Sequence, residues 1–299
     1  MPAPSPGLSA TTRRAGLLAA GAALLSGCSG PRILDRLVPD GDYRAETGIA
    51  YGDDPRQVLD VYRPAQDSAP GAARPPLVVF FYGGTWTHGT RADYRFVGEA
   101  LASRGAVVVI PDYRLSPQVR YPAFLQDSAA AVRWAADRAA ALGADPDRIV
   151  PMGHSAGAYN AAMLALDPRW LEAAGVARRR IAAWIGMAGP YDFLPIDDPE
   201  AQVAFGWPDT PRDSQPIVHA GPGAPRTLLL AADHDRVVDP DRNSAALAAR
   251  LRAAGVEVTM HRYPRVGHVA LVGSLARPLR WLAPAHADVV AFLGLPPPR

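Results

Sequence analysis

The chain has 299 residues, of which 31 are Arg, none is Lys and 29 are acidic, so its formal net charge is +2. This near balance argues against a broad nucleic-acid-binding surface. A single cysteine excludes an internal disulfide framework and a cysteine-rich metal module. With 48% apolar and 20% charged residues, the composition is that of a globular protein rather than a disordered one.

The first 27 residues have the pattern of an export signal. Arg13 and Arg14 precede an apolar run at 15–25, which is shorter than the roughly 20 residues that cross a bilayer core. The sequence Leu-Ser-Gly-Cys at 25–28 resembles a bacterial lipobox, in which cleavage precedes the cysteine and the thiol is acylated. We expect a signal peptide at 1–27, lipidation at Cys28, a tether at 28–45 and export to the bacterial cell envelope. The alternatives are an ordinary secretion signal and a buried helix.

From residue 46 to residue 299 the pattern predicts one domain of alternating strands and helices. Short apolar runs predict strands at 77–82, 106–110, 148–152, 181–187 and 227–232. Alternation of apolar and polar residues predicts a strand at 57–62 and, less cleanly, one at 256–263. Apolar residues at helical spacing predict helices at 92–103, 124–142, 244–253 and 286–293, and an Ala-rich stretch predicts one at 156–166. This alternation is typical of an α/β fold with a mostly parallel sheet and helices on both faces. The segment at 188–225 breaks the rhythm and is expected to form a small, partly helical lid.

The strongest chemical signal is Gly-His-Ser-Ala-Gly at 153–157, a G-x-S-x-G motif. It follows a predicted strand and precedes a predicted helix, which is the context in which this motif forms a nucleophile elbow. The start of the helix adds free N–H groups and a positive field where an oxyanion would form. We therefore expect Ser155 to be a nucleophile; otherwise it is a serine in a plain strand-to-helix turn.

A nucleophilic serine needs a base, and the base needs an orienting acid. Asp235 follows the predicted strand at 227–232, and His268 follows the predicted strand at 256–263. The order Ser, Asp, His is the order in which hydrolases with a nucleophile elbow carry these groups. We expect His268 as the base and Asp235 as the acid, with Asp233 as a rival acid in the same loop.

Backbone donors for an oxyanion are expected from two loops. The strand at 77–82 leads into Tyr-Gly-Gly-Thr-Trp at 82–86, and glycines let the main chain turn its N–H groups into a pocket. The predicted donors are Gly83 and Gly84, together with Ala156 in the elbow. Trp86 and Tyr159 are candidate substrate-binding residues, although core packing accounts for them equally well.

Taken together, these pieces resemble esterase-type α/β-hydrolases, of the group that includes hormone-sensitive-lipase-like and feruloyl-esterase-like enzymes. The resemblance covers about residues 46–295 and is carried by YGGTW at 82–86, PDYRLSP at 111–117, YPAFLQDSAAAVRW at 121–134, DPDRI at 145–149, GHSAG at 153–157, the Asp235 loop and GH at 267–268. The chain departs from the family pattern at Tyr82, where members usually carry a histidine that steadies the loop by hydrogen bonding. A tyrosine hydroxyl is able to form such a bond, so the departure bears more on the substrate class than on the mechanism.

The resemblance implies a carboxylesterase that acts through an acyl-enzyme on Ser155. The sequence shows no metal-ligand cluster and no dinucleotide-type glycine loop, so no cofactor is expected. The expected partners are a small-molecule ester and, through the lipid anchor, a membrane surface, but no nucleic acid. Two alternatives stay open: an aryl-formamidase-like amide hydrolase, and a non-catalytic binding lipoprotein of the same fold. The acyl chain, the alcohol, the choice of membrane and the oligomeric state are not specified by these patterns.

Overall fold

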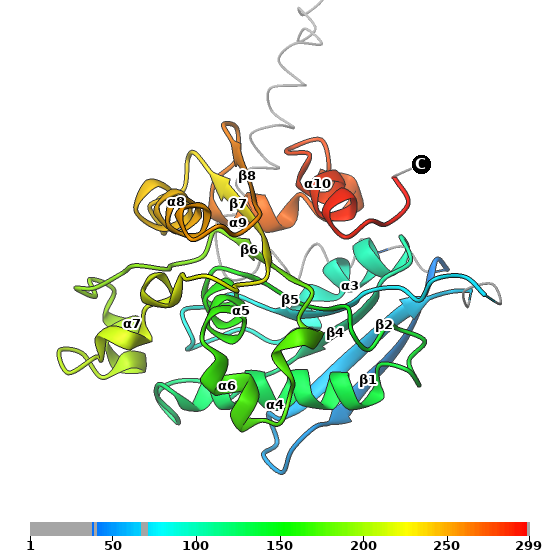
Figure 1. Cartoon of the computed structure of the whole chain (residues 1–299), viewed down its shortest axis with the longest axis horizontal. Helices are drawn as coiled ribbons and strands as arrows, with labels where there is room; N and C mark the ends of the chain where they lie inside the picture. Colours follow the sequence, from blue (N-terminus) through cyan, green and yellow to red (C-terminus); the bar gives the residue numbers. More distant parts are fainter. Residues whose placement is uncertain (1–37, 39–40, 67–70, 298–299) are drawn as a thin grey trace, which may run out of the picture.

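The computed structural model describes residues 38, 41–66 and 71–297, so the predicted signal segment and Cys28 lie outside the described residues. Within these ranges, eight strands form one sheet (Figure 1). The strands are β1 (Tyr43–Ala50), β2 (Val58–Pro64), β3 (Leu77–Phe81), β4 (Val107–Pro111), β5 (Ile149–His154), β6 (Ala183–Met187), β7 (Arg226–Ala232) and β8 (Val258–Tyr263). Their order across the sheet is β1-β2-β4-β3-β5-β6-β7-β8. From β4 to β8 in this order, neighbouring strands are parallel. At the other end of the sheet, β2 pairs antiparallel with both β4 and the edge strand β1.

Helices cover both faces of the sheet. On one face lie α3 (Arg95–Ala102) and α10 (Ala285–Phe292); on the other lie α4 (Ala123–Arg138), α5 (Ala156–Leu166) and α6 (Pro168–Ala173) (Figure 1). The other helices are α7 (Pro199–Phe205), α8 (Ala246–Ala253), α9 (His268–Gly273) and the π-helical turn η5 (Asp241–Ala245). Short 3-10 turns are η1 (Arg91–Tyr94), η2 (Arg178–Arg180), η3 (Arg212–Ser214), η4 (Pro216–His219) and η6 (Arg277–Leu279). The predicted class, a mostly parallel α/β sheet with helices on both faces, is confirmed.

The central strands are buried on both faces, which explains their continuous apolar sequences. Every residue of β3 (LVVFF) and of β4 (VVVIP) is buried. Parallel strands covered by helices lose both faces to the core, so branched and aromatic side chains fill them. Because β3, β5, β7 and β8 are parallel, the loops that follow them all leave from the carboxyl ends of the strands. Open α/β sheets bind their ligands at these ends.

The first strand differs from the expectation. The sequence assigns 28–45 to a tether, but β1 begins at Tyr43 and pairs with β2 through Tyr43–Pro64 and Ala50–Val58. Most residues of β1 are exposed. An exposed edge strand is held by backbone hydrogen bonds and needs no apolar pattern, so nothing in the sequence marks it. The folded domain therefore begins before the predicted boundary at residue 46.

The irregular segment at 188–225 contains the helix that its composition led us to expect. Asp198 caps α7 by accepting a hydrogen bond from the N–H of Ala201 at 2.8 Å, and Pro199 occupies the first helical position. Gly206, with φ of 67°, ends the helix in the left-handed conformation. In Figure 1, α7 lies at the left of the molecule, and Phe205 packs it against the core, with its ring centroid 4.7 Å from that of Trp86. Among the helices of the described ranges, none is both long enough and apolar enough to span a bilayer.

Candidate active site

Ser155 lies in the tight turn between β5 and α5. Its φ of 55° and ψ of −124° lie where non-glycine residues are rare, at a cost of roughly 1–3 kcal/mol. Two glycines make the turn possible. A Cβ on Gly153 would lie 2.1 Å from the carbonyl oxygen of Gly157, and a Cβ on Gly157 would lie 2.0 Å from that of Phe81. The predicted elbow is therefore present, at the edge of the sheet where the parallel strands end.

His268 connects Ser155 to Asp235. Its Nε2 lies 2.8 Å from Ser155 Oγ, and its Nδ1 lies 2.7 Å from Asp235 Oδ2. The three residues come from separate connections: the elbow after β5, the loop after β7 and the first turn of α9. In this arrangement Nδ1–H donates to the carboxylate, which leaves Nε2 to accept the serine proton. The structure thus brings together the three side chains that the sequence predicted to meet.

The loop after β7 holds Asp235 as an anion. Its Oδ1 accepts hydrogen bonds from the N–H groups of Val237 at 2.8 Å and Val238 at 2.9 Å, which leaves Oδ2 for His268. Burial by itself raises the pKa of Asp235, but the hydrogen bond and charge of His268 and the two N–H groups outweigh it, so the net pKa is lowered. The rival Asp233 is paired elsewhere, with Arg262 Nε at 2.6 Å.

The chain after β3 turns sharply beside the nucleophile. Gly84 has φ of 133°, and the two residues after it, Thr85 and Trp86, have φ of 48° and 60°. Such values are costly for residues with a Cβ and are typical of functional loops. No hydrogen bond among the described residues uses the N–H groups of Gly83, Gly84, Thr85 or Ala156. These donors are therefore free to bind an oxygen of a substrate.

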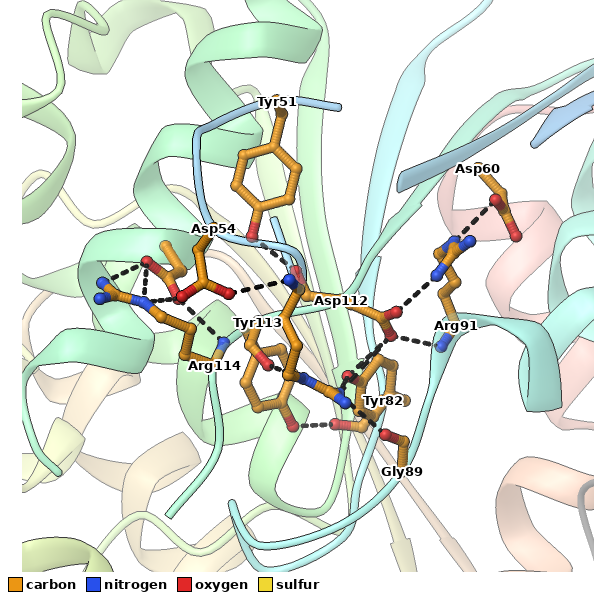
Figure 2. A network of polar contacts seen from close by, with 11 residues as sticks. Tyr51, Asp54, Asp60, Tyr82, Gly89, Arg91, Asp112, Tyr113 and Arg114 are labelled. Carbon is orange, nitrogen blue, oxygen red and sulfur yellow. Dashed lines mark hydrogen bonds and ion pairs between the residues drawn. The ribbon is translucent and has the colours of Figure 1, made fainter. Parts of the chain in front are cut away.

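A buried polar network fixes both ends of this loop (Figure 2). Asp112, after β4, accepts hydrogen bonds at Oδ1 from the hydroxyl of Tyr82 at 2.9 Å and from the N–H of Arg91 at 2.7 Å. Its Oδ2 accepts a hydrogen bond from the Arg91 guanidinium at 2.6 Å. Burial above all raises the pKa of Tyr82 well above its ordinary value, so the hydroxyl stays protonated and donates. Tyr82 thus makes the steadying bond that is expected of the family's histidine.

Arg56 braces the same loop and was not predicted. Its Nη2 donates to the hydroxyl of Tyr82 at 2.8 Å and to the carbonyl of Gly89 at 3.0 Å, and its Nε donates to the carbonyl of Tyr113 at 2.9 Å. The hydroxyl of Tyr113 donates in turn to the carbonyl of Tyr82 at 2.8 Å. Arg56 stands 26 positions before Tyr82, and no local pattern marks a residue that acts across such a separation.

Two clefts meet at Ser155. The first, of about 310 Å³, extends toward α7, and the second, of about 260 Å³, runs beside His268 and α9. Apolar side chains that line the first include Trp86, Phe193, Ile196 and Val238, and those that line the second include Val269 and Val272. Thr85 and Val237 line both clefts. The nucleophile therefore has room on two sides for the two parts of a substrate.

Trp86 and Tyr159 differ in their relation to these clefts. Trp86 lines the first cleft, and its Nε1–H donates to Asn160 Oδ1 at 3.1 Å. Tyr159 is fully buried, packs edge-on against Trp86 with ring centroids 5.2 Å apart and donates its hydroxyl to the carbonyl of Ser214. Trp86 therefore lies where a substrate can touch it. Tyr159 stands behind it and lines neither cleft, so core packing, the alternative interpretation of its sequence position, accounts for it.

Three other histidines bond to the main chain. The Nε2 atoms of His154, His219 and His286 lie 3.0, 2.7 and 3.0 Å from the carbonyl oxygens of His268, Asp213 and Ala100. These bonds fix the rings and leave them outside the hydrogen-bonded triad. In the part of the chain that the structure describes, no group of three or more His, Cys, Asp or Glu side chains is arranged to hold a metal ion.

Comparisons with known proteins agree with this geometry. The sequence model of the BD-FAE family matches residues 59–251, more than half of the chain. Esterase LipC of Mycobacterium tuberculosis is 31% identical over 239 residues, which cover 74% of this chain and 58% of LipC. An esterase of Thermogutta terrifontis with bound propionate is 25% identical with a TM-score of 0.68, and the match covers 87% of this chain and 98% of that one. Esterase B of Lactobacillus rhamnosis, with a tributyrin phosphonate inhibitor, has a TM-score of 0.75 at 23% identity and 96% coverage of both chains.

These matches support the fold over most of the chain, but the family match covers only part of the candidate site. The structural similarities confirm the α/β-hydrolase fold that the sequence resemblance implied. The BD-FAE match includes Ser155 and Asp235 but ends before His268, so the histidine is placed by geometry. The chain spans less than two thirds of the length of the curated relatives it matches first, with 58% of LipC and 32% of the Arabidopsis thaliana methylesterase ICMEL1.

Proposed function

This chain belongs to the BD-FAE family and has the α/β-hydrolase fold, and on that premise we propose that it is a serine esterase that cleaves carboxylic esters through an acyl-enzyme. The observation that carries the proposal is the unbroken hydrogen-bonded triad of Asp235, His268 and Ser155, with bonds of 2.7 and 2.8 Å. The esterases among its relatives and structural neighbours support the same reaction class.

Acylation follows from the positions of the three side chains. His268 Nε2 takes the proton of Ser155 Oγ as that oxygen attacks the carbonyl carbon of the ester. Negative charge then collects on the former carbonyl oxygen, and we assign the unused N–H groups of Gly84 and Ala156 as its donors. We include Gly83 and Thr85 as neighbouring donors, because their N–H groups are also unused. Each well-placed donor is worth roughly 3 kcal/mol in the transition state.

The imidazolium of His268 returns its proton to the leaving alcohol, and the C–O bond to that alcohol breaks. Water then attacks the acyl-enzyme with His268 as base, and the same oxyanion donors act again. Ser155 recovers its hydrogen, and the carboxylic acid leaves. Asp235 stays ionised throughout and holds the imidazole in the productive tautomer.

Each of the two clefts holds a different part of the substrate. The leaving oxygen has to receive a proton from His268, so the alcohol part lies in the second cleft, which His268 lines. The acyl part then lies in the first cleft, against Trp86. Apolar side chains line both clefts, and charged side chains join them: Asp192, Asp197, Asp198, Asp239 and Arg242 in the first, and Asp93 in the second.

Replacement of the nucleophile tests the proposal. Ser155→Ala is expected to abolish hydrolysis of p-nitrophenyl butyrate and labelling by a fluorophosphonate, because no oxygen remains to be acylated. Ser103→Ala, a matched serine at the end of α3, is expected to leave both unchanged. Turnover by the Ser155→Ala protein close to that of the parent would refute the mechanism.

The same assays address the two alternatives. A non-catalytic binding protein would remain folded and yet resist the fluorophosphonate, and the assembled triad argues against that outcome. An amide hydrolase would cleave an aryl formamide with a higher kcat/KM than the matching phenyl ester. We expect the ester to be preferred, because an alcohol leaves more readily than an amine.

We further propose that the mature chain begins at Cys28 and is exported and held at a membrane surface of the bacterial envelope by acyl chains on that cysteine. The support is the charged start, the short apolar run and the lipobox-like sequence at 25–28. Two acyl chains suffice for stable anchoring of an otherwise soluble domain.

A further inference from the structure

His154, the residue between Gly153 and the nucleophile, packs against the base. Its side chain is buried, and its ring centroid lies 4.8 Å from that of His268. Its Nε2 lies 3.0 Å from the backbone carbonyl oxygen of His268. A carbonyl oxygen only accepts hydrogen bonds, so Nε2 carries the hydrogen and Nδ1 is the bare nitrogen.

The second nitrogen of His154 is left without a partner. Nδ1 is buried and has no hydrogen-bond partner among the described residues. A buried acceptor without a donor is destabilising, whereas an aliphatic side chain of similar size would carry no such cost. Burial, and then the neighbouring His268, lower the pKa of His154 to about 3, so the ring is neutral at neutral pH. Core packing therefore does not explain why residue 154 is a histidine. The hydrogen bond from its Nε2 to the carbonyl oxygen of His268 explains it.

The bond joins two elements that the sheet keeps apart. Ser155 follows β5 and His268 follows β8, and β6 and β7 lie between these strands. The side chain of His154 spans this gap directly and fixes the main chain at the residue that carries the base. His268 is the first residue of α9. A hydrogen bond to its carbonyl oxygen therefore fixes the backbone from which the imidazole extends.

We propose that His154 is a positioning residue that locks the main chain of His268 to the nucleophile elbow, so that base and nucleophile keep their distance through both half-reactions. This role rests on the proposed esterase function. A neutral ring suits it, because a second positive charge 4.8 Å away would oppose formation of the imidazolium on His268. Misplacement of a catalytic group by about 1 Å costs roughly a hundredfold in rate, so a small relaxation of α9 is enough to matter.

Three substitutions separate this role from simple packing. His154→Gln places an amide N–H near the former Nε2 position, His154→Asn places one near the former Nδ1 position, and His154→Leu supplies no donor. We expect the Asn and Leu proteins to lose roughly tenfold to a hundredfold in kcat for p-nitrophenyl butyrate, with KM changed less than about threefold. We expect the Gln protein to keep kcat within about fivefold of the parent.

A Leu protein as active as the parent, or a Gln protein no better than the Asn protein, would overturn the proposal. If the Leu protein fails to fold, the comparison of Gln with Asn decides alone, since both are polar amides that differ in where the donor lies. Melting temperatures of the Gln and Asn proteins show whether a difference in kcat reflects global stability.

A spectroscopic measurement on the parent does not depend on activity. Nitrogen-15 NMR of labelled histidine is expected to show His154 with hydrogen on Nε2 and a bare Nδ1 at neutral pH. The opposite tautomer would overturn the positioning role even in an active esterase. Failure of the esterase function itself would appear separately, as a folded parent that resists the fluorophosphonate.

Discussion

Ser155, Thr85 and Trp86 all have positive φ, and they surround the point where the substrate carbonyl has to lie. Each costs free energy that the surrounding packing has to offset. Such strain beside reacting atoms fixes the hydroxyl and the backbone donors before the substrate arrives, so little reorganisation is left for the reaction. Single substitutions also distinguish the two candidate acids of the triad, Asp235 and Asp233.

Asp235→Asn is expected to lower kcat by roughly 10³- to 10⁴-fold, because an amide opposite Nδ1 favours the wrong tautomer of His268. Asp233→Asn, its matched control, is expected to stay within about twofold of the parent, since Asp233 pairs with Arg262 outside the triad. Steady-state kinetics on p-nitrophenyl butyrate measure both. Equal losses in the two variants would contradict the assignment.

The lowered pKa of Asp235 also predicts how stability depends on pH. A carboxyl whose pKa falls on folding stabilises the folded state above its ordinary value of 3.8, and this contribution is lost as pH falls through the lower folded pKa. The parent is therefore expected to exceed Asp235→Asn in free energy of unfolding at pH 7, with the difference shrinking below about pH 4. Urea unfolding of both proteins at pH 7 and below pH 4 measures this, and a difference that grows in acid would be inconsistent with it.

Trp86 predicts the acyl preference. Because Trp86 lines the first cleft, Trp86→Leu is expected to shift the highest kcat/KM toward longer acyl chains by at least one two-carbon step in a p-nitrophenyl ester series. Trp134→Leu, a substitution of another largely buried tryptophan on α4 outside both clefts, is the control for general loosening. An unchanged chain-length profile in the Trp86 variant would show that the acyl group lies elsewhere.

The loop at 82–91 is held as a unit, since Asp112 bonds to its first and last residues (Figure 2). Arg56 bonds to Tyr82 and Gly89 within the same loop. A loop fixed at both ends presents its N–H groups at constant positions. The network is charged and largely buried, so removal of one member takes a hydrogen bond from each of its neighbours.

Tyr82→Phe is therefore expected to lower kcat by roughly tenfold and stability by about 1–3 kcal/mol. Tyr263→Phe is the matched control, because its hydroxyl donates to Asp288 at 2.6 Å, away from the clefts. The control is expected to lose stability with kcat unchanged. Parallel kinetics and thermal unfolding of the two proteins make the comparison, and equal effects on kcat would rule out a role of Tyr82 in the oxyanion loop.

Elements with a strong local pattern were predictable and those without one were not. Apolar runs predicted the strands from β3 to β7, and alternation predicted β2 and, less cleanly, β8. The Ala-rich stretch at 156–166 predicted α5 with its observed bounds. β1 is an exposed edge strand, and α9 is a short helix whose first residue the sequence identified only as the base. The triad was predictable because each member follows a strand, whereas Arg56 and His154 act through contacts that only the folded chain creates.

At the scale of the whole molecule, the proposed anchor limits how far the domain can move. Fifteen residues from Cys28 to Tyr43 reach at most roughly 50 Å when fully extended. Cys28→Ser is expected to transfer esterase activity from the membrane fraction to the soluble fraction of a bacterial host, with kcat unchanged. Fractionation followed by the p-nitrophenyl butyrate assay measures this. Activity that stays with the membranes in the variant would argue against an anchor at Cys28.

The residues of the candidate active site are spread unevenly along the sequence. The oxyanion loop and the nucleophile are encoded by residue 157, whereas the acid comes at 235 and the base at 268. A ribosome therefore completes the nucleophile and the predicted oxyanion donors well before it adds the base. On the proposed mechanism, a chain still being made has no base for Ser155 until the segment after β8 has been added. Under the proposed export, that order of synthesis keeps an unfinished chain from cleaving esters in the compartment where it is made.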